Sequence, residues 1–196
     1  MAGRPRKFKL DAAYDAATDL FWEQGYQTTS LDQLLSTMQL SKSSFYQTFS
    51  SKKDLFERCL SRYDEQAVAD MRNRLAKAPL AIDFIRAAFS QLSAEVQKSP
   101  GRRGCFIMNT VVEFAQSDKR IAHIFQRNMK AMRKIFAEAV TSAQSSGDIN
   151  EALDPPIVAD FLVTTIIGLK SQAKAGSSGK KIANIADFAV ASIMKE

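Results

Sequence analysis

The sequence predicts an all-α protein, and two observations lead to this prediction. Apolar residues recur at intervals of three and four along almost the whole chain, which is the spacing of one face of an α-helix. The one run rich in β-branched residues, 161–169, would have no partner strand, so we expect it to form a helix buried on most sides. Counted by this periodicity, the chain forms about nine helices, of which the first three are short.

Residues that favour helix ends bound these three short helices. Gly25 follows the first apolar stripe and is placed to end that helix. A hydroxyl at 28–30 can cap a second helix, because Ser and Thr side chains accept a hydrogen bond from the first turn. Ser41 can cap a third helix that reaches Phe49.

Longer helices follow, separated by Pro, Gly and Ser turn signals. We expect a fourth helix from Lys52, a fifth from Pro79, a sixth over 105–116, a seventh ending at Gly147, an eighth from Pro155, and a last one with Ile182, Ile185, Ala189 and Ile193 on its inward face.

Composition argues against most enzyme classes. Two cysteines among 196 residues make no disulfide framework, and no leader or long apolar run is present, so we expect a cytoplasmic protein. The single histidine, His123, makes a zinc site or a Ser–His nucleophile hard to build. No glycine-rich phosphate-binding motif occurs. We expect no catalytic residue, no metal and no cofactor.

The N-terminal ten residues contain four basic side chains and no acidic one. Pro5 predicts an extended backbone that aims Arg4 and Arg6 the same way. Extended arginine-rich arms enter narrow minor grooves of DNA, so this segment is a candidate DNA-binding arm. The alternative is a solvated terminus with no binding role.

Segment 28–56 has the pattern of a helix-turn-helix: two short helices, a tight turn, and a second helix opened by serine and basic residues. The start of a helix offers unpaired N–H groups to a phosphate. Side chains that could donate hydrogen bonds into a groove follow that start: Lys42, Ser43, Ser44 and Gln47. Tyr46 adds a rigid ring with a polar tip suited to a phosphate.

Residues 8–56 resemble the TetR family of transcriptional regulators. The positions that match the family pattern are Phe21, Gly25, Tyr26, Thr28, Thr29, Ser30, Ser41, Phe45, Tyr46, Phe49, Ser51, Lys52 and Leu55. The chain departs from the pattern at Met38-Gln39, where members commonly carry Ala-Gly, and at Lys53, where an acidic residue is frequent. A glutamine in a turn that keeps a positive φ would cost up to about 1 kcal/mol.

The resemblance implies a homodimer formed through the last two helices, with each third helix in a major groove of a palindromic operator. Lys42, Ser43, Ser44 and Gln47 would contact bases or their surroundings, while Thr29, Tyr46 and Lys52 would hold phosphates. It also implies two domains: a DNA-binding domain with its basic arm over 1–52, and a helical regulatory and dimerisation domain over 53–196.

An effector pocket in the second domain is a further implication. Two interpretations of Cys105 stay open: a reactive thiol activated by Arg102, Arg103 and a helix N-terminus, or a small packing residue. Glu113 could meet a ligand or pair with one of these arginines. The candidate effector-binding or sensing residues are Cys105, Met108, Asn109, Glu113, Phe125 and Met129.

Together these patterns predict a sequence-specific DNA-binding regulator, a repressor released from its operator by a small-molecule or thiol-reactive effector. The alternative is an architectural DNA-binding protein without an effector, which would show little preference among DNA sequences.

Overall fold

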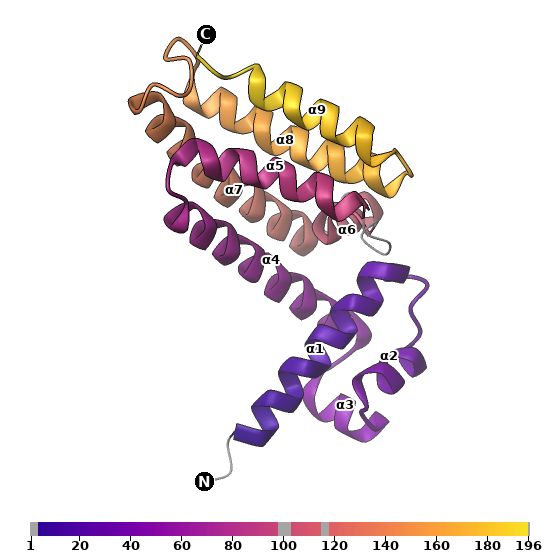
Figure 1. The fold of residues 1–196 in the computed structure, drawn as a ribbon. Helices are drawn as coiled ribbons and strands as arrows, with labels where there is room; N and C mark the ends of the chain where they lie inside the picture. The colour runs from indigo at the N-terminus through magenta and orange to yellow at the C-terminus, as the bar shows by residue number, and fades with distance from the viewer. Residues whose placement is uncertain (1–3, 98–102, 115–117, 196) are drawn as a thin grey trace. The chain divides into compact units, whose positions relative to one another are not determined.

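The computed structural model describes residues 4–97, 103–114 and 118–195. Over these ranges the chain forms nine α-helices, and its only β-pairing is an isolated bridge between Ile149 and Met194, so the all-α prediction is confirmed (Figure 1). The helices are α1 (Arg4–Gln24), α2 (Leu31–Met38), α3 (Lys42–Thr48), α4 (Lys52–Lys77), α5 (Ala81–Gln97), α6 (Phe106–Phe114), α7 (Lys119–Ser145), α8 (Pro155–Lys174) and α9 (Gly179–Ala191). None of these helices is long and apolar enough to cross a membrane.

The chain folds into two compact units. The first unit combines residues 1–66 with 109–124, and the second combines 67–108 with 125–196. Helices α4, α6 and α7 each begin in one unit and end in the other. The first unit therefore contains a piece of the middle of the chain.

An aromatic cluster forms the centre of the first unit. The rings of Phe21 on α1 and Phe56 on α4 meet edge to face with centroids 4.9 Å apart. Tyr26 packs against Phe56 at 4.9 Å, and Phe114 of α6 lies 5.3 Å from Tyr26. Aromatic pairs at such distances add to the stabilisation from burial alone. The cluster therefore joins α1, α4 and the segment 109–124 in one core.

The second unit packs α5, α8 and α9 against one another, as Figure 1 shows, with α7 completing the core. Residues 161–169 lie within α8, so the predicted helix is confirmed there. The prediction of burial on most sides is wrong: Leu162, Val163 and Leu169 are buried, but Phe161, Thr164 and Gly168 are exposed. Ile185, predicted to face inward, is instead 38% exposed. The buried side of α9 is set by Ile182, Ala186 and Ala189, and Ile193 is buried just after the helix ends. At 3.6 residues per turn, Ile185 falls to one side of that stripe.

The predictions of an extended N-terminal backbone and of a short first helix are both wrong, because residues 4–7 form the first turns of α1, which is 21 residues long. Proline is tolerated there: the first N–H groups of a helix have no partner inside it, and the proline φ of about −65° is already helical. Arg4 and Arg6 are thus carried on a helix, and residues 1–3 lie outside the described residues.

Two other predicted helix boundaries shift slightly. The fifth helix begins at Ala81 rather than Pro79, because the Leu80 carbonyl accepts the first bonds of that helix, from the N–H groups of Asp83 and Phe84. The sixth covers Phe106–Phe114, and the predicted end at Gln116 lies outside the described residues.

The turn between α2 and α3 contains the only described non-glycine residue with a positive φ, Gln39 at φ 55° and ψ 42°. The N–H groups of Gln39 and Leu40 bond back to the carbonyls of Ser36 and Leu35 at 3.2 and 3.0 Å, which closes the end of α2. The left-handed conformation common at helix ends is thus kept without glycine.

Replacing Gln39 by Gly is expected to raise the free energy of unfolding by up to about 1 kcal/mol, because glycine adopts this conformation without Cβ strain. Chemical denaturation followed by circular dichroism measures the change. Gln39→Ala is the matched control: it shortens the side chain but keeps Cβ, and should not stabilise the protein. Equal stabilisation by both substitutions would assign the effect to something other than the backbone.

Candidate nucleic-acid interface

Two serine caps and two buried phenylalanines fix the position of α3. Ser30 forms a capping box with Gln33 at the start of α2. Ser41 caps α3, since its Oγ accepts the N–H of Ser44 at 3.1 Å. Phe45 and Phe49 are fully buried and anchor α3 to the core, as their spacing predicts. One face of α3 is therefore held inward and the opposite face stays open.

The exposed face of α3 brings together four predicted contact residues. Lys42, Ser43, Tyr46 and Gln47 are all exposed, Tyr46 to 52%. Side chains one turn apart lie over each other on a helix, so these four form one polar surface. Ser44 is half-buried, and its hydroxyl lies 2.9 Å from the Ser41 hydroxyl, which makes it part of the cap.

Lys52 and Thr29 occupy different surroundings. The ammonium group of Lys52 lies 4.3 Å above the centre of the Tyr26 ring, and partial burial holds the pKa of Lys52 below its ordinary value. Thr29 is fully buried, and its hydroxyl donates to the Gly25 carbonyl at 2.6 Å. Thr29 thus stabilises the turn after α1 instead of presenting a hydroxyl to solvent.

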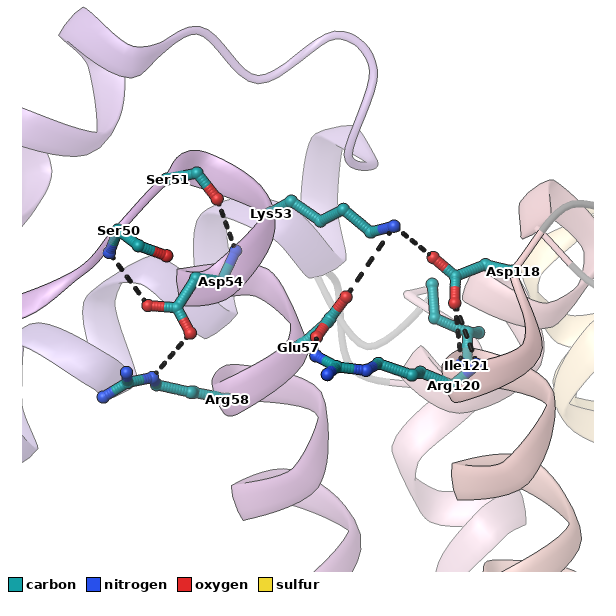
Figure 2. Close-up of polar contacts among 9 residues, drawn as sticks. All are labelled: Ser50, Ser51, Lys53, Asp54, Glu57, Arg58, Asp118, Arg120 and Ile121. Carbon is teal, nitrogen blue, oxygen red and sulfur yellow. Dashed lines mark hydrogen bonds and ion pairs between the residues drawn. The ribbon is translucent and has the colours of Figure 1, made fainter.

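Hydrogen bonds also fix the junction between α3 and α4 (Figure 2). The Asp54 carboxylate accepts the N–H of Ser50 at 3.0 Å and the Arg58 Nε–H at 2.9 Å, while Ser51 Oγ accepts the Asp54 N–H at 3.1 Å. Burial raises the pKa of Asp54, but the bonds from Arg58 and Ser50 outweigh this, so the pKa lies below its usual value. The first turn of α4 is therefore well held relative to α3.

A second set of ion pairs extends from the other side of α4 to the start of α7 (Figure 2). Lys53 Nζ lies 2.6 Å from Asp118 Oδ2, and Arg120 donates to Glu57 at 2.9 Å. The N–H of Gln27, in the turn before α2, donates to Glu113 at 3.2 Å. Sequence reasoning missed these contacts. The one usable signal was Lys53, a cation where the family pattern favours an acid.

The predicted effector residues divide between the two units. Asn109 and Glu113 belong to the first, whereas Cys105, Met108, Phe125 and Met129 belong to the second. All are half-buried except Glu113, which is exposed. Their role stays a prediction.

A groove of about 760 Å³ in the first unit was also missed by sequence analysis. His123 lies on its wall, among side chains of both charges. The residues that line it are Tyr14, Asp54, Glu57, Arg58, Ser61, Arg62, Glu65, Lys119, Arg120, His123 and Ile124. Within the described part of the chain, no group of three or more His, Cys, Asp or Glu side chains could hold a metal ion.

Comparison with known proteins agrees with this geometry. Residues 13–59 match the family described as "Bacterial regulatory proteins, tetR family", and 81–188 match "Tetracyclin repressor-like, C-terminal domain". The HTH-type transcriptional repressor ComR of Escherichia coli K12 is 28% identical over 185 residues, which is 94% of this chain and 88% of ComR.

Solved structures give the same result. The TetR family regulator CifR, as a cysteine mutant complexed with a 26-bp operator DNA, has a TM-score of 0.80 and 26% identity, over 96% of this chain and 98% of CifR. The reduced form of E. coli NemR shares the fold with a TM-score of 0.86 and 18% identity, over 96% and 97% of the two chains. Since the C-terminal match alone spans more than half of the sequence, this chain belongs to the TetR family of transcriptional regulators.

Proposed function

We propose that this regulator is a repressor that binds a palindromic operator as a homodimer and leaves it when an effector binds. The observation that carries the proposal is the exposed polar face of α3, held in place by Phe45, Phe49 and the Ser41 cap. ComR, a relative along most of its length, is named a repressor, and CifR is solved with operator DNA. Nothing in the proposal requires a catalytic step.

Each exposed residue of the interface has a role that its chemistry suits. Gln47 and Lys42 would reach base edges in the major groove, because a glutamine amide pairs with adenine and lysine with guanine. Ser43 and the adjacent Ser44 would contact bases or the DNA groups next to them. Tyr46 and Lys52 would hold phosphates, which set the position of the protein but read no sequence.

Three further residues would assist this contact. Arg4 and Arg6, in the first turn of α1, would bring positive charge to the DNA backbone or minor groove. Thr29 would act through the turn that it stabilises, since its hydroxyl is committed to Gly25.

The last two helices would form the dimer interface. Ile157 and Phe161 on α8 are 67% and 41% exposed, and Ile185 and Phe188 on α9 are 38% and 73% exposed. Each pair is spaced to share one face of its helix, and clustered apolar exposure marks an interaction surface. A second copy of the chain fits, because a two-fold axis also presents two α3 helices to a palindromic site.

The effector would act by population shift. A molecule that binds better to the dimer whose two helix-turn-helix units are spaced wrongly for DNA weakens operator affinity. The loss is set by the ratio of the molecule's affinities for the two states of the dimer. The residues proposed to bind or sense it remain Cys105, Met108, Asn109, Glu113, Phe125 and Met129. Cys105 allows a thiol-reactive effector as well as a reversible one.

Operator recognition is tested by fluorescence anisotropy on DNA from upstream of the gene, against a scrambled duplex at about 0.15 M salt. We expect a preference of about a thousandfold or more. Gln47→Ala should lose about 10- to 100-fold of specific affinity and accept more bases at one position. Lys77→Ala is the control and should bind normally, because Lys77 is exposed at the end of α4, outside the proposed DNA contacts and outside α8 and α9.

Near-equal binding to both duplexes would leave an architectural role or a distant operator. Selection from random DNA separates these, because an architectural protein enriches no sequence. With an operator in hand, the same assay screens small molecules and thiol reagents for release.

Replacing Phe188 by Arg is expected to weaken the dimer by tenfold or more, about 1.4 kcal/mol, because it places a charge in an apolar interface. Sedimentation velocity across a concentration series measures the monomer fraction. Leu80→Arg is the control, since Leu80 is 51% exposed but lies outside α8 and α9. An unchanged monomer fraction in Phe188→Arg would move the interface elsewhere.

The two cysteines should differ in reactivity toward a colorimetric thiol reagent. Cys59 is buried, and desolvation raises its pKa to about 12, so almost no thiolate forms at pH 8. Cys105 is only half-buried and should react first. We expect one fast thiol per chain, lost in Cys105→Ser and kept in Cys59→Ala. A Cys105 as slow as Cys59 would remove the thiol-reactive effector from the proposal.

A further inference from the structure

We propose that the ion pairs Lys53–Asp118 and Glu57–Arg120 couple the DNA-binding helices to the start of α7, with Lys53 and Asp118 as positioning residues. This inference rests on the proposed function, because it takes α3 and the first turn of α4 to be the DNA-binding elements. It concerns contacts inside the first unit only.

The four side chains form a connected network (Figure 2). Lys53 Nζ lies 2.6 Å from Asp118 Oδ2 and 3.8 Å from Glu57 Oε1. The other oxygen of Glu57 accepts from Arg120 Nη1 at 2.9 Å. Lys53 and Glu57 stand one turn apart on α4, and Asp118 and Arg120 stand at the start of α7. The network therefore joins two helices whose sequences lie far apart.

Asp118 has two functions in this network. Its Oδ2 binds Lys53, while its Oδ1 accepts the N–H groups of Arg120 and Ile121 at 2.9 and 3.3 Å. Those two bonds cap the first turn of α7. One carboxylate thus connects the start of α7 to the first turn of α4. A displacement of either of these helix ends therefore strains its contact with the other.

The two carboxylates of this network are better shielded from water than its two cations. The side chains of Asp118 and Glu57 are 8% and 16% exposed, whereas those of Lys53 and Arg120 are 55% and 80% exposed. A carboxylate removed from water loses much more when its cation leaves than a solvated one does. The hydrogen bond from Lys53 also holds the pKa of Asp118 below its usual range, in agreement with a charged pair.

The same part of the chain also touches the opposite end of the helix-turn-helix. Glu113 accepts the N–H of Gln27, just before α2, and Phe114 packs against Tyr26. Lys53 lies in the first turn of α4, the helix that follows α3. Glu113 and Phe114 therefore contact the chain before α2, and Asp118 and Arg120 contact the chain after α3. Contacts on both sides can respond to a change in the position of the helix-turn-helix.

The link is a feature of this chain. An acidic residue at position 53, which the family pattern favours, would repel both Asp118 and Glu57. Lys53 converts that repulsion into attraction. Because coupling between sites is reciprocal, operator binding should stabilise the start of α7, and a change at α7 should alter operator affinity.

Hydrogen exchange of the full-length protein, with and without the duplex selected in the binding assay, tests this. In the wild type we expect the operator to slow exchange in α3 and also, by about fivefold or more, in peptides covering 118–124. Lys53→Met and Asp118→Asn should keep the slowing in α3 but lose it in 118–124. Asparagine still caps a helix, so Asp118→Asn removes the charge and not the cap.

Two controls separate coupling from general damage. Arg58→Met breaks the Arg58–Asp54 pair on the other side of α4 and should keep the slowing in 118–124. Lys53→Arg retains the cation and should also show the slowing in 118–124. The inference is overturned if the operator does not slow exchange in 118–124 of the wild type. It is also overturned if that slowing survives in Lys53→Met. If α3 itself is not slowed, the proposed DNA-binding function fails, and this inference fails with it.

Discussion

The rings of Phe21, Tyr26, Phe56 and Phe114 are the contact on which the first unit depends. They draw α1, α4 and a segment from the middle of the chain into one core. Phe45 and Phe49 are buried and hold α3 inward, with the Phe49 ring edge to face with Tyr14 of α1 at 5.6 Å, and the polar face of α3 is left open. The exposed residues of α3 therefore owe their position to buried apolar side chains together with the Ser41 cap.

Local features of this arrangement could be predicted from sequence. Gly25, Ser30 and Ser41 act on the residues next to them, so their effect on helix ends is visible in a short window. The positive φ of Gln39 was raised only as a condition, from the glycine that the family pattern has in this turn, and the structure shows that the conformation is kept. The open face of α3 followed from the spacing of Phe45 and Phe49.

Other features could not be predicted, because they depend on contacts between distant residues. No periodicity joins Lys53 to Asp118 or Phe114 to Tyr26. Thr29 shows a subtler limit: three hydroxyls in a row could cap α2, and Ser30 does so because Gln33 completes its capping box. The hydroxyl of Thr29 instead donates a hydrogen bond to the Gly25 carbonyl. The prediction from Pro5 was wrong because the fixed φ of proline suits both an extended chain and a first helical turn.

The discontinuity of the first unit has a consequence for how such proteins can be recombined. Residues 1–66 alone would leave Tyr26 and Phe56 without the Phe114 ring, and Lys53 without Asp118. The first unit is thus not one continuous stretch of the chain, and a cut after α4 separates side chains that contact each other. A chimaera between relatives keeps the contacts of the first unit only if residues 1–66 and the 109–124 segment come from the same parent protein. In this chain the two segments therefore have to be exchanged together.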